Sequence, residues 1–228
     1  MAGDDRVSTA NLFDAAFALG LPYQLVTNLR PLDPAWRLEG PARCVHHFGS
    51  VDIFLEAIEQ AARGDVLVID NDGREDEGCI GDLVVIEAAA AGLGGIIVWG
   101  RNRDSTDLRR IAIPVFSRGS CAAGPTRLDA RSSDAFGEAR LDSAVVRDGD
   151  LVTADEDGLL IVAAADYPAI RERALEIRTK EAAQAEAVKH GTSLRAQLGL
   201  DEFKRDRERN PELTFRQHLA ARGGAIEV

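Results

Sequence analysis

The chain has 228 residues, 45% hydrophobic and 29% charged, a balance typical of one folded domain with an appendage rather than of a disordered chain. Its net charge of −11 disfavours binding to nucleic-acid phosphates, so an anionic substrate would need a locally positive site. No apolar run approaches the roughly 20 residues that cross a bilayer, and no signal peptide is recognisable. Three widely spaced cysteines without a CxxC pair favour a reducing compartment. We therefore expect a soluble, cytoplasmic protein that binds neither membranes nor nucleic acid.

The first part of the chain predicts a helix, a strand and a second helix. The first helix runs from Ser8 or Thr9 to about Leu19 and ends at Gly20. The segment RCVHH, residues 43–47, predicts a strand after a Gly-Pro turn, and apolar residues at helical spacing predict a helix over 52–62.

The central part predicts a parallel sheet. The apolar run at 66–69 is typical of a strand covered on both faces. A charged loop, NDGREDEG at 71–78, precedes a helix over 82–91 that closes at Gly92. The remaining predicted elements are a strand at 96–99, a short helix at 105–110 and a strand at 114–117. This βαβαβ alternation calls for parallel strands and right-handed crossovers, so we predict an α/β fold.

The last part predicts a β-rich closing section followed by helices. Strands are expected at 139–146, 151–154 and 159–162, separated by Asp-Gly turns, and a helix is expected over 167–188. From residue 191 the chain is strongly charged and carries few core residues. We therefore predict a domain over residues 1–190 and a helical C-terminal extension over 191–228.

Three polar residues follow two neighbouring strands of the predicted sheet. Asp82 opens the helix after the strand at 66–69, and Arg103-Asp104 follows the next strand, with 20 residues between Asp82 and Arg103. Ligands of α/β sheets bind at the carboxyl ends of parallel strands. One helix plus one strand separate the two positions, so the chain can bring them together at one sheet edge.

Each part of this group could bind a 2-oxo acid. The first backbone N–H groups of the helix at Gly81, Asp82, Leu83 and Val84 lack helical partners and can hold a carboxylate. Arg103 can grip a carboxylate or 2-oxo oxygen with its fork of donors, whereas Asp104 can bind a hard divalent cation and Asp82 a metal-bound water. The same spacing also suits a plain helix cap with a solvated neighbour, so spacing alone leaves both interpretations open.

The sequence also resembles a known family. The segment GDVLVIDNDGREDEGCIGDLVVIEAAAAGLGGIIVWGRNRDSTDL, then PVFSRG and GDLVTADEDGLLIV, looks like the RraA-like family, which includes the 4-hydroxy-4-methyl-2-oxoglutarate/4-carboxy-4-hydroxy-2-oxoadipate aldolases. The family's hallmark of an Asp, twenty residues and then Arg-Asp matches Asp82 and Arg103-Asp104. The resemblance covers residues 8 to about 175.

This resemblance implies a swivelling-domain-like, layered β/β/α catalytic domain and a class II, metal-dependent carbon–carbon lyase. Gly81–Val84 and Arg103 would bind the pyruvyl part of a 2-oxo-dicarboxylate, Asp104 would bind Mg²⁺ or Mn²⁺, and Asp82 would act through water. The sites would lie between subunits of a homotrimer or homohexamer. A carboxylate of the neighbouring subunit would assist the metal, and its candidates are Glu172, Glu176 and Glu181.

The implied reaction is retro-aldol cleavage of a 4-hydroxy-2-oxo-dicarboxylic acid. Removal of the C4 hydroxyl proton would cleave the C3–C4 bond and leave a pyruvate enolate, stabilised by Arg103 and by the metal as a Lewis acid. Oxaloacetate decarboxylation passes through the same enolate and is expected as a side activity. Two alternatives stay open: a dedicated 2-oxo acid decarboxylase, and a non-catalytic protein-binding regulator of a ribonuclease, the role that gave the family its name.

Some residues near the motif depart from the family or remain ambiguous. The loop at 71–78 is charged, whereas many members of the family have small residues and glycines there. Arg101 could either meet the substrate's distal carboxylate or lie solvated on the surface. Cys79 and Cys121 lie close to the motif, yet no histidine at a suggestive position marks either as a nucleophile. The four histidines lack metal-ligand spacing, so core or surface roles are expected for them.

Overall fold

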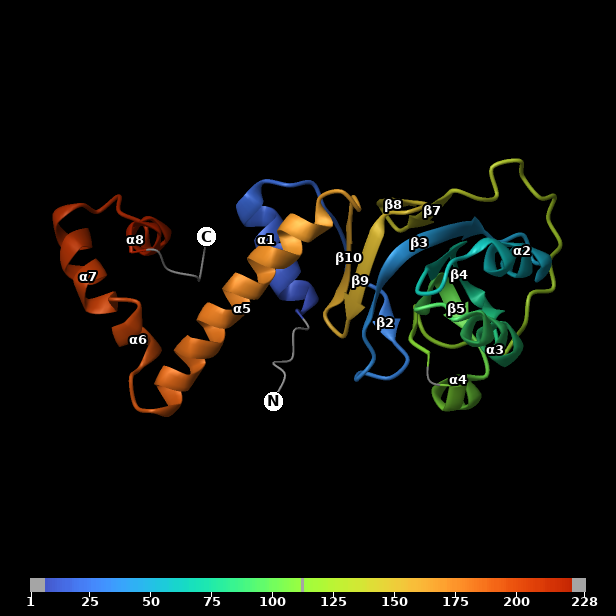
Figure 1. Cartoon of the computed structure of the whole chain (residues 1–228), viewed down its shortest axis with the longest axis horizontal. Helices are drawn as coiled ribbons and strands as arrows, with labels where there is room; N and C mark the ends of the chain where they lie inside the picture. The colour runs from blue at the N-terminus through green and yellow to red at the C-terminus, as the bar shows by residue number, and fades with distance from the viewer. Residues whose placement is uncertain (1–6, 112, 223–228) are drawn as a thin grey trace. The chain divides into compact units, whose positions relative to one another are not determined.

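A computed structural model of the chain describes residues 7–111 and 113–222. The chain divides into two compact units, one comprising Met1–Leu21 and Pro168–Val228, the other Pro22–Tyr167. The Pro22–Tyr167 unit holds the whole β-structure and the three predicted site residues (Figure 1). The predicted domain boundary between residues 190 and 191 stays a prediction.

The Pro22–Tyr167 unit is built on one eight-stranded mixed sheet of strand order β1-β10-β9-β3-β4-β5-β6-β2. Its strands are β1 (Gln24–Val26), β2 (Arg30–Pro31), β3 (Leu38–His46), β4 (Val66–Ile80), β5 (Gly95–Asn102), β6 (Val115–Ser117), β9 (Leu151–Asp155) and β10 (Gly158–Val162). The neighbours β3, β4, β5 and β6 are parallel, and the outer pairs are antiparallel. This arrangement confirms the predicted parallel α/β fold.

Three helices join the parallel strands: α2 (Asp52–Gln60), α3 (Asp82–Ala91) and α4 (Ser105–Ile111). They cover one face of the sheet, whereas the hairpin of β7 (Glu138–Leu141) and β8 (Ala144–Arg147) lies on the other (Figure 1). The apolar run of β4 serves both layers, because Leu67 and Ile69 pack with the helices while Val66 and Val68 pack on the hairpin side. The predicted β/β/α layering follows from this alternation.

Two predicted elements differ from the structure. The stretch at 139–146 is the β7–β8 hairpin rather than one strand, and the chain turns at Asp142, whose φ of 62° lies in the left-handed region. The charged stretch at 71–78 is an irregular continuation of β4 rather than a loop. Asp70 lies opposite Trp99 and Ile80 lies opposite Asn102, and between these two pairs the register of β4 against β5 shifts three times.

The other unit is helical. Helix α1 (Thr9–Leu19) begins after Ser8, whose Oγ accepts the N–H of Asn11, and ends at Gly20 with φ 65°, both as predicted. The Nδ2 of Asn11 donates to Glu181 on α5 (Tyr167–Lys189) at 2.9 Å, so these two helices lie side by side (Figure 1). Beyond α5 follow α6 (Leu194–Gln197), α7 (Leu200–Arg209) and α8 (Phe215–Ala221).

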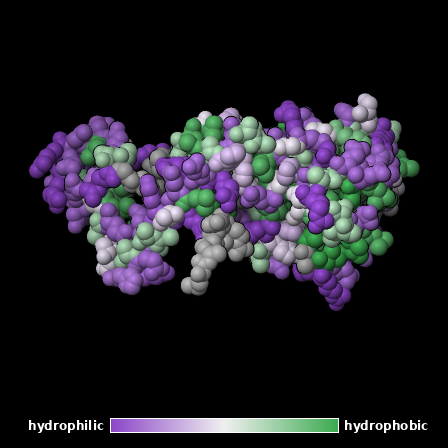
Figure 2. All heavy atoms as spheres, viewed as in Figure 1, coloured by the Kyte–Doolittle hydropathy of each residue, from purple (hydrophilic) through white to green (hydrophobic). Residues whose placement is uncertain are grey.

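The surface combines polar and apolar regions. Figure 2 shows apolar atoms in green in the region of α2 to α4 and mostly polar atoms, in purple, over α7. Exposed large side chains of α2 and α3 include Leu55, Leu83 and Ile86. Across the described part of the chain, no helix has both the length and the apolar character to span a membrane.

Candidate active site

The structure brings Asp82, Arg103 and Asp104 together at the carboxyl ends of β4 and β5. The backbone N–H of Arg103 donates to the carbonyl of Ile80 at 2.9 Å, which ties the two strand ends to each other. One oxygen of Asp104, Oδ2, accepts hydrogen bonds from Arg103 Nε at 3.2 Å and from the Asp82 backbone N–H at 3.4 Å. The predicted meeting of the three residues is therefore observed, whereas their chemical roles stay predictions.

The start of α3 supplies backbone N–H donors that have no partner among the helix's own carbonyls, and two of them contact side-chain oxygens of Asp104 and Asp82. Gly81 is the N-cap residue and provides no side-chain cap, so the first turn relies on other partners. The Asp82 carboxylate accepts the N–H of Leu83 at 2.8 Å, which directs the carboxylate toward its own helix. Val84 packs into the core and Leu83 points to solvent, so these two residues can offer an anionic ligand their backbone only.

Three glycines allow the chain to approach Arg103 and Asp104 closely. A Cβ at Gly81 would lie 2.4 Å from Asp104 Oδ2, one at Gly124 would lie 2.6 Å from Arg103 Nη1, and one at Gly78 would lie 2.9 Å from Arg103 Cβ. Any side chain at these positions would displace the carboxylate or the guanidinium. The glycines therefore keep open space beside both groups.

A buried network fixes the turn that carries the Arg-Asp pair. Asn102 is fully buried; its Oδ1 accepts from Ser117 Oγ at 2.8 Å and its Nδ2 donates to Ser105 Oγ at 3.0 Å. Asp104 has a φ of 54°, a left-handed conformation that Asp tolerates better than most residues. The network thus holds Asp104 in a sparsely populated conformation that points its carboxylate at Gly81.

The residues present fit a hard divalent cation at Asp104. Mg²⁺ is usually held by one or two carboxylates, with waters and substrate oxygens completing six ligands. Asp104 offers one half-buried carboxylate, and the missing Cβ of Gly81 leaves room beside Oδ2. Asp82 contributes its carboxylate to its own helix, so it fits a role through water better than direct ligation.

The charged stretch of β4 pairs with arginines beside the site. Glu75 accepts from Arg101 at 2.7 Å and lies 2.6 Å from Arg118, and the guanidinium of Arg118 stacks over Trp99 at 4.8 Å. Arg101 is thus ion-paired rather than solvated. A substrate carboxylate would have to compete with Glu75 for it.

Cys79 has a histidine neighbour that the sequence did not reveal. Its Sγ lies 3.4 Å from His47 Nδ1, although 32 residues separate them in the chain. Burial raises the pKa of the Cys79 thiol well above its usual range and lowers the pKa of His47, so both side chains stay neutral. The pair therefore belongs to the core, which is one of the two roles expected for the histidines, and Cys79 is not activated as a nucleophile.

The proposed partner carboxylates lie on α5. Glu176 accepts from Arg173 at 2.8 Å and Glu181 accepts from Asn11, so two of the three candidates already have partners within their own unit. The contribution of Glu172, Glu176 or Glu181 to a neighbouring subunit stays a prediction.

Comparison with known proteins agrees with the fold and the motif. The family model described as RraA-like, Aldolase/RraA, matches residues 9–161. This layered α/β chain, with its Asp and Arg-Asp at neighbouring strand ends, belongs to the RraA-like family, as the sequence resemblance predicted.

Individual relatives carry two different kinds of name. A protein of Halalkalibacterium halodurans named "Putative 4-hydroxy-4-methyl-2-oxoglutarate aldolase" is 26% identical over 165 residues, covering 72% of this chain and 78% of the relative. Among solved structures, an uncharacterized protein from Pseudomonas syringae pv. tomato has a TM-score of 0.72 at 26% identity, covering 83% of this chain and 92% of that one. Streptomyces coelicolor RraAS2, described as an unusual member of the RNase ES inhibitor RraA family, has a TM-score of 0.68 at 27% identity and covers 78% and 91%.

Proposed function

We propose that the protein is a divalent-metal-dependent carbon–carbon lyase that cleaves a 4-hydroxy-2-oxo-dicarboxylic acid and releases pyruvate. The observation that carries this proposal is the convergence of the Asp104 carboxylate, the Arg103 guanidinium and the start of α3 around Gly81, which has no side chain. The aldolase name of the Halalkalibacterium halodurans relative supports the same reaction class.

Arg103 is the proposed substrate clamp. Its Nε is engaged by Asp104, and within residues 7–111 and 113–222 no hydrogen bond occupies its two terminal nitrogens. The side chain is 45% exposed, so these nitrogens can reach a carboxylate or a developing enolate oxygen. By stabilising that oxygen as its negative charge grows, Arg103 would make the chain's main contribution to lowering the activation barrier.

The start of α3 and Asp104 complete the proposed site. The first N–H groups of α3 would hold the substrate's carboxylate next to the 2-oxo group, in place of their present contacts with Asp104 and Asp82. A Mg²⁺ or Mn²⁺ ion held by Asp104 would supply Lewis-acid polarisation of that group. Asp82, beside them, would orient a water and receive or return a proton through it. Because decarboxylation of oxaloacetate also yields pyruvate enolate, we propose it as a side activity.

We further propose that the protein works as a cytoplasmic homotrimer or homohexamer whose sites lie between subunits. Three free cysteines, Cys44, Cys79 and Cys121, are compatible with a reducing compartment. The acidic chain fits a small-molecule substrate and disfavours nucleic acid as a direct ligand.

A second candidate function is regulation of a ribonuclease through protein binding. The similarity to RraAS2, described as belonging to an RNase ES inhibitor family, favours it. The two candidates differ in one property that can be measured, because a binding regulator needs no metal to act.

Metal-dependent turnover tests the proposed function. Pyruvate release from oxaloacetate and from 4-hydroxy-4-methyl-2-oxoglutarate should require Mg²⁺, stop with EDTA, and fall about 100-fold or more in Asp104→Asn, because the loss of one charged transition-state contact costs that much. Asn tolerates the left-handed backbone at this position, so the variant removes charge without disturbing the turn. Asp107→Asn, at an exposed position on α4 three residues after Asp104, is the matched control and should keep wild-type activity.

Two results would change the assignment. A rate that equals the uncatalysed background with every 2-oxo-dicarboxylate would contradict the lyase and leave the regulator. A kcat/KM for oxaloacetate that exceeds that for the hydroxy acid by orders of magnitude would identify a dedicated decarboxylase instead.

A further inference from the structure

A second group of potential ligand side chains lies away from Asp104, where β3 and β4 run side by side. His46 ends β3 and faces Asp70 directly in the parallel register, and Asp72 follows on a left-handed turn with φ 54°. One ligand atom from each of the three lies within 4.8 Å of the others. His46 Nε2 and Asp72 Oδ2 are 3.3 Å apart.

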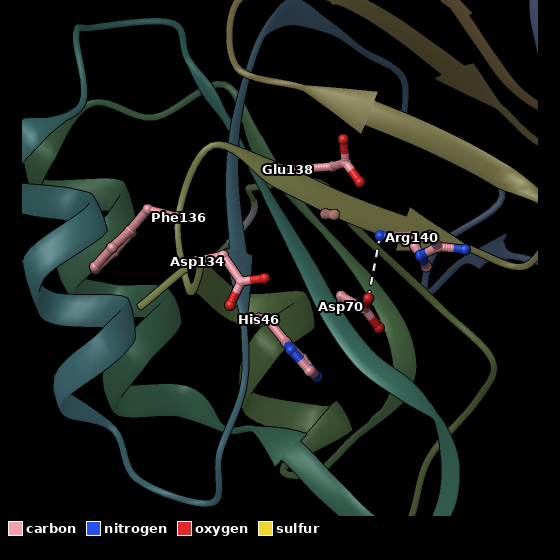
Figure 3. Close-up of a pocket in the computed structure, with 7 residues that line it drawn as sticks. His46, Asp70, Asp134, Phe136, Glu138 and Arg140 are labelled. Atoms are coloured by element: carbon pink, nitrogen blue, oxygen red, sulfur yellow. Dashed lines mark hydrogen bonds between the residues drawn. The ribbon is translucent and has the colours of Figure 1, made fainter. Parts of the chain in front are cut away.

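Two of these side chains, His46 and Asp70, line a pocket within the Pro22–Tyr167 unit, and Asp72 contacts His46 beside it. Its volume is about 300 Å³, and it is lined by His46, Asp70, Asp134, Phe136, Glu138, Ala139 and Arg140. Figure 3 shows the carboxylates of Asp134 and Glu138 on the same side of the sheet as Asp70 and His46. The lining therefore holds three carboxylates against the guanidinium of Arg140, with Glu138 also paired to Arg147, and this excess of acidic groups favours a cation.

Asp70 provides the strongest evidence for a cation, because its carboxylate is buried and pairs with no arginine or lysine among the described residues. It is 7% exposed; Oδ1 accepts the backbone N–H of Asp72 at 2.9 Å, and Oδ2 accepts the backbone N–H of Arg140 at 3.1 Å (Figure 3). Within the described part of the chain, no arginine or lysine forms an ion pair with it. By contrast, the equally buried Glu77 is paired with Arg127. A buried negative charge is costly without a positive partner, so Asp70 calls for one from outside the chain.

The donor set defines the kind of cation. Imidazole nitrogen together with carboxylate oxygen suits Zn²⁺, Co²⁺ or Mn²⁺, whereas Mg²⁺ and Ca²⁺ prefer oxygen alone. Two ligand atoms bound at 2.0–2.2 Å to one tetrahedral ion lie roughly 3.3–3.6 Å apart. The 3.3 Å between His46 and Asp72 matches that spacing, and only Asp70 needs to move closer.

We propose that His46, Asp70 and Asp72 form a second metal site, which binds a divalent transition metal ion at the rim of the acidic pocket. The site shares no residue with the Asp104 group and does not depend on the proposed lyase activity. The pocket leaves space beside the ion for water, as three-ligand metal sites do.

Metal binding in the full-length Asp104→Asn protein tests this site without contribution from the other one. Co²⁺ titration followed by visible absorption, together with equilibrium dialysis against Zn²⁺, should give one ion per chain and a spectrum with nitrogen ligation. In this background, His46→Ala should weaken the affinity by at least about 10–100-fold, since even groups outside the ligand sphere contribute that much. His190→Ala is the matched control, because this histidine directly follows α5 and its side chain is 82% exposed, and the variant should bind the ion as the parent does.

A second variant guards against loss of folding. The side chain of Asp72 is 59% exposed, and Asn tolerates the left-handed backbone at this position, so Asp72→Asn should fold normally. The variant should lower the affinity for the metal ion about as much as His46→Ala does. Unchanged binding in both His46→Ala and Asp72→Asn, or equal loss in His190→Ala, would overturn the proposal. Because the readout is metal affinity, an inactive lyase would not be mistaken for a missing site.

Discussion

Replacement of Arg103 by lysine is expected to lower kcat/KM for pyruvate release by about 100- to 1,000-fold, the cost of removing one donor to a developing oxyanion. The guanidinium does two things at once, because Nε donates to Asp104 Oδ2 at 3.2 Å while the terminal nitrogens remain for the substrate. A lysine ammonium is one point charge on a flexible stem. It can contact Asp104 or the substrate, but it cannot hold both in the geometry of a planar fork.

Arg110→Lys is the control for this substitution. Arg110 lies on α4, is 75% exposed and pairs with Asp107 at 2.8 Å, so a lysine there keeps the charge and the contact. Its kinetics should match those of the wild type, and circular dichroism should show all three proteins folded alike. If Arg103→Lys stays within a few-fold of wild type, Arg103 does not contact the substrate and the proposed clamp is wrong.

Removal of the Arg127 side chain is expected to destabilise the protein by about 3–5 kcal/mol, the range for breaking one partner of a buried ion pair. Arg127 Nε donates to Glu77 at 3.2 Å, and Nη2 donates to the His47 carbonyl at 3.1 Å and to Asn71 Oδ1 at 2.9 Å. Arg127→Ala would deprive Glu77, which is 4% exposed, of its closest cation and leave it the longer contact with Arg74 Nε at 3.7 Å. It would also remove one of the ties between the 118–137 segment and β4, where the N–H of Gly78 still donates to the carbonyl of Ala123.

Urea unfolding followed by circular dichroism measures this effect, with Arg131→Ala as the matched control. Arg131 lies on the same segment and pairs with Glu56, but both side chains are well exposed to solvent. Its removal should shift the unfolding midpoint far less, because exposed ion pairs contribute little. Equal shifts for the two arginines would show that burial of the Glu77 pair adds nothing.

The parallel core could be predicted because its strands and helix ends have local sequence patterns that can be recognised. The run at 66–69 is apolar on both faces since two layers cover it, and Gly20 and Gly92 end their helices with the left-handed conformation that glycine favours. The β7–β8 hairpin was missed because its turn uses Asp142 in place of the usual glycine pair. The charged part of β4 shows no regular alternation of polar and apolar residues, since its strand pairing shifts register, and its sequence therefore predicts a loop.

The two sites differ in the same way, because one depends on the order of elements along the chain and the other on the register between two strands. Asp82 and Arg103 follow consecutive parallel strands, so chain order alone brings them to one edge. His46 and Asp70 meet through the register between β3 and β4, which spacing along the chain does not encode. The contact between His47 and Cys79 depends on the irregular course of β4 after Asp70, so neither pair could be identified from the sequence.

The irregular part of β4 has a consequence for how such proteins can diverge. Between Asp70 and Ile80 this strand advances ten residues while β5 advances three, from Trp99 to Asn102. The surplus chain absorbs insertions and deletions without moving the regular pairing of Val66–Ile69 or the turn that carries Arg103. A change of length in this one stretch is therefore expected to reshape the surface beside Arg101 while Arg103 and Asp104 keep their places.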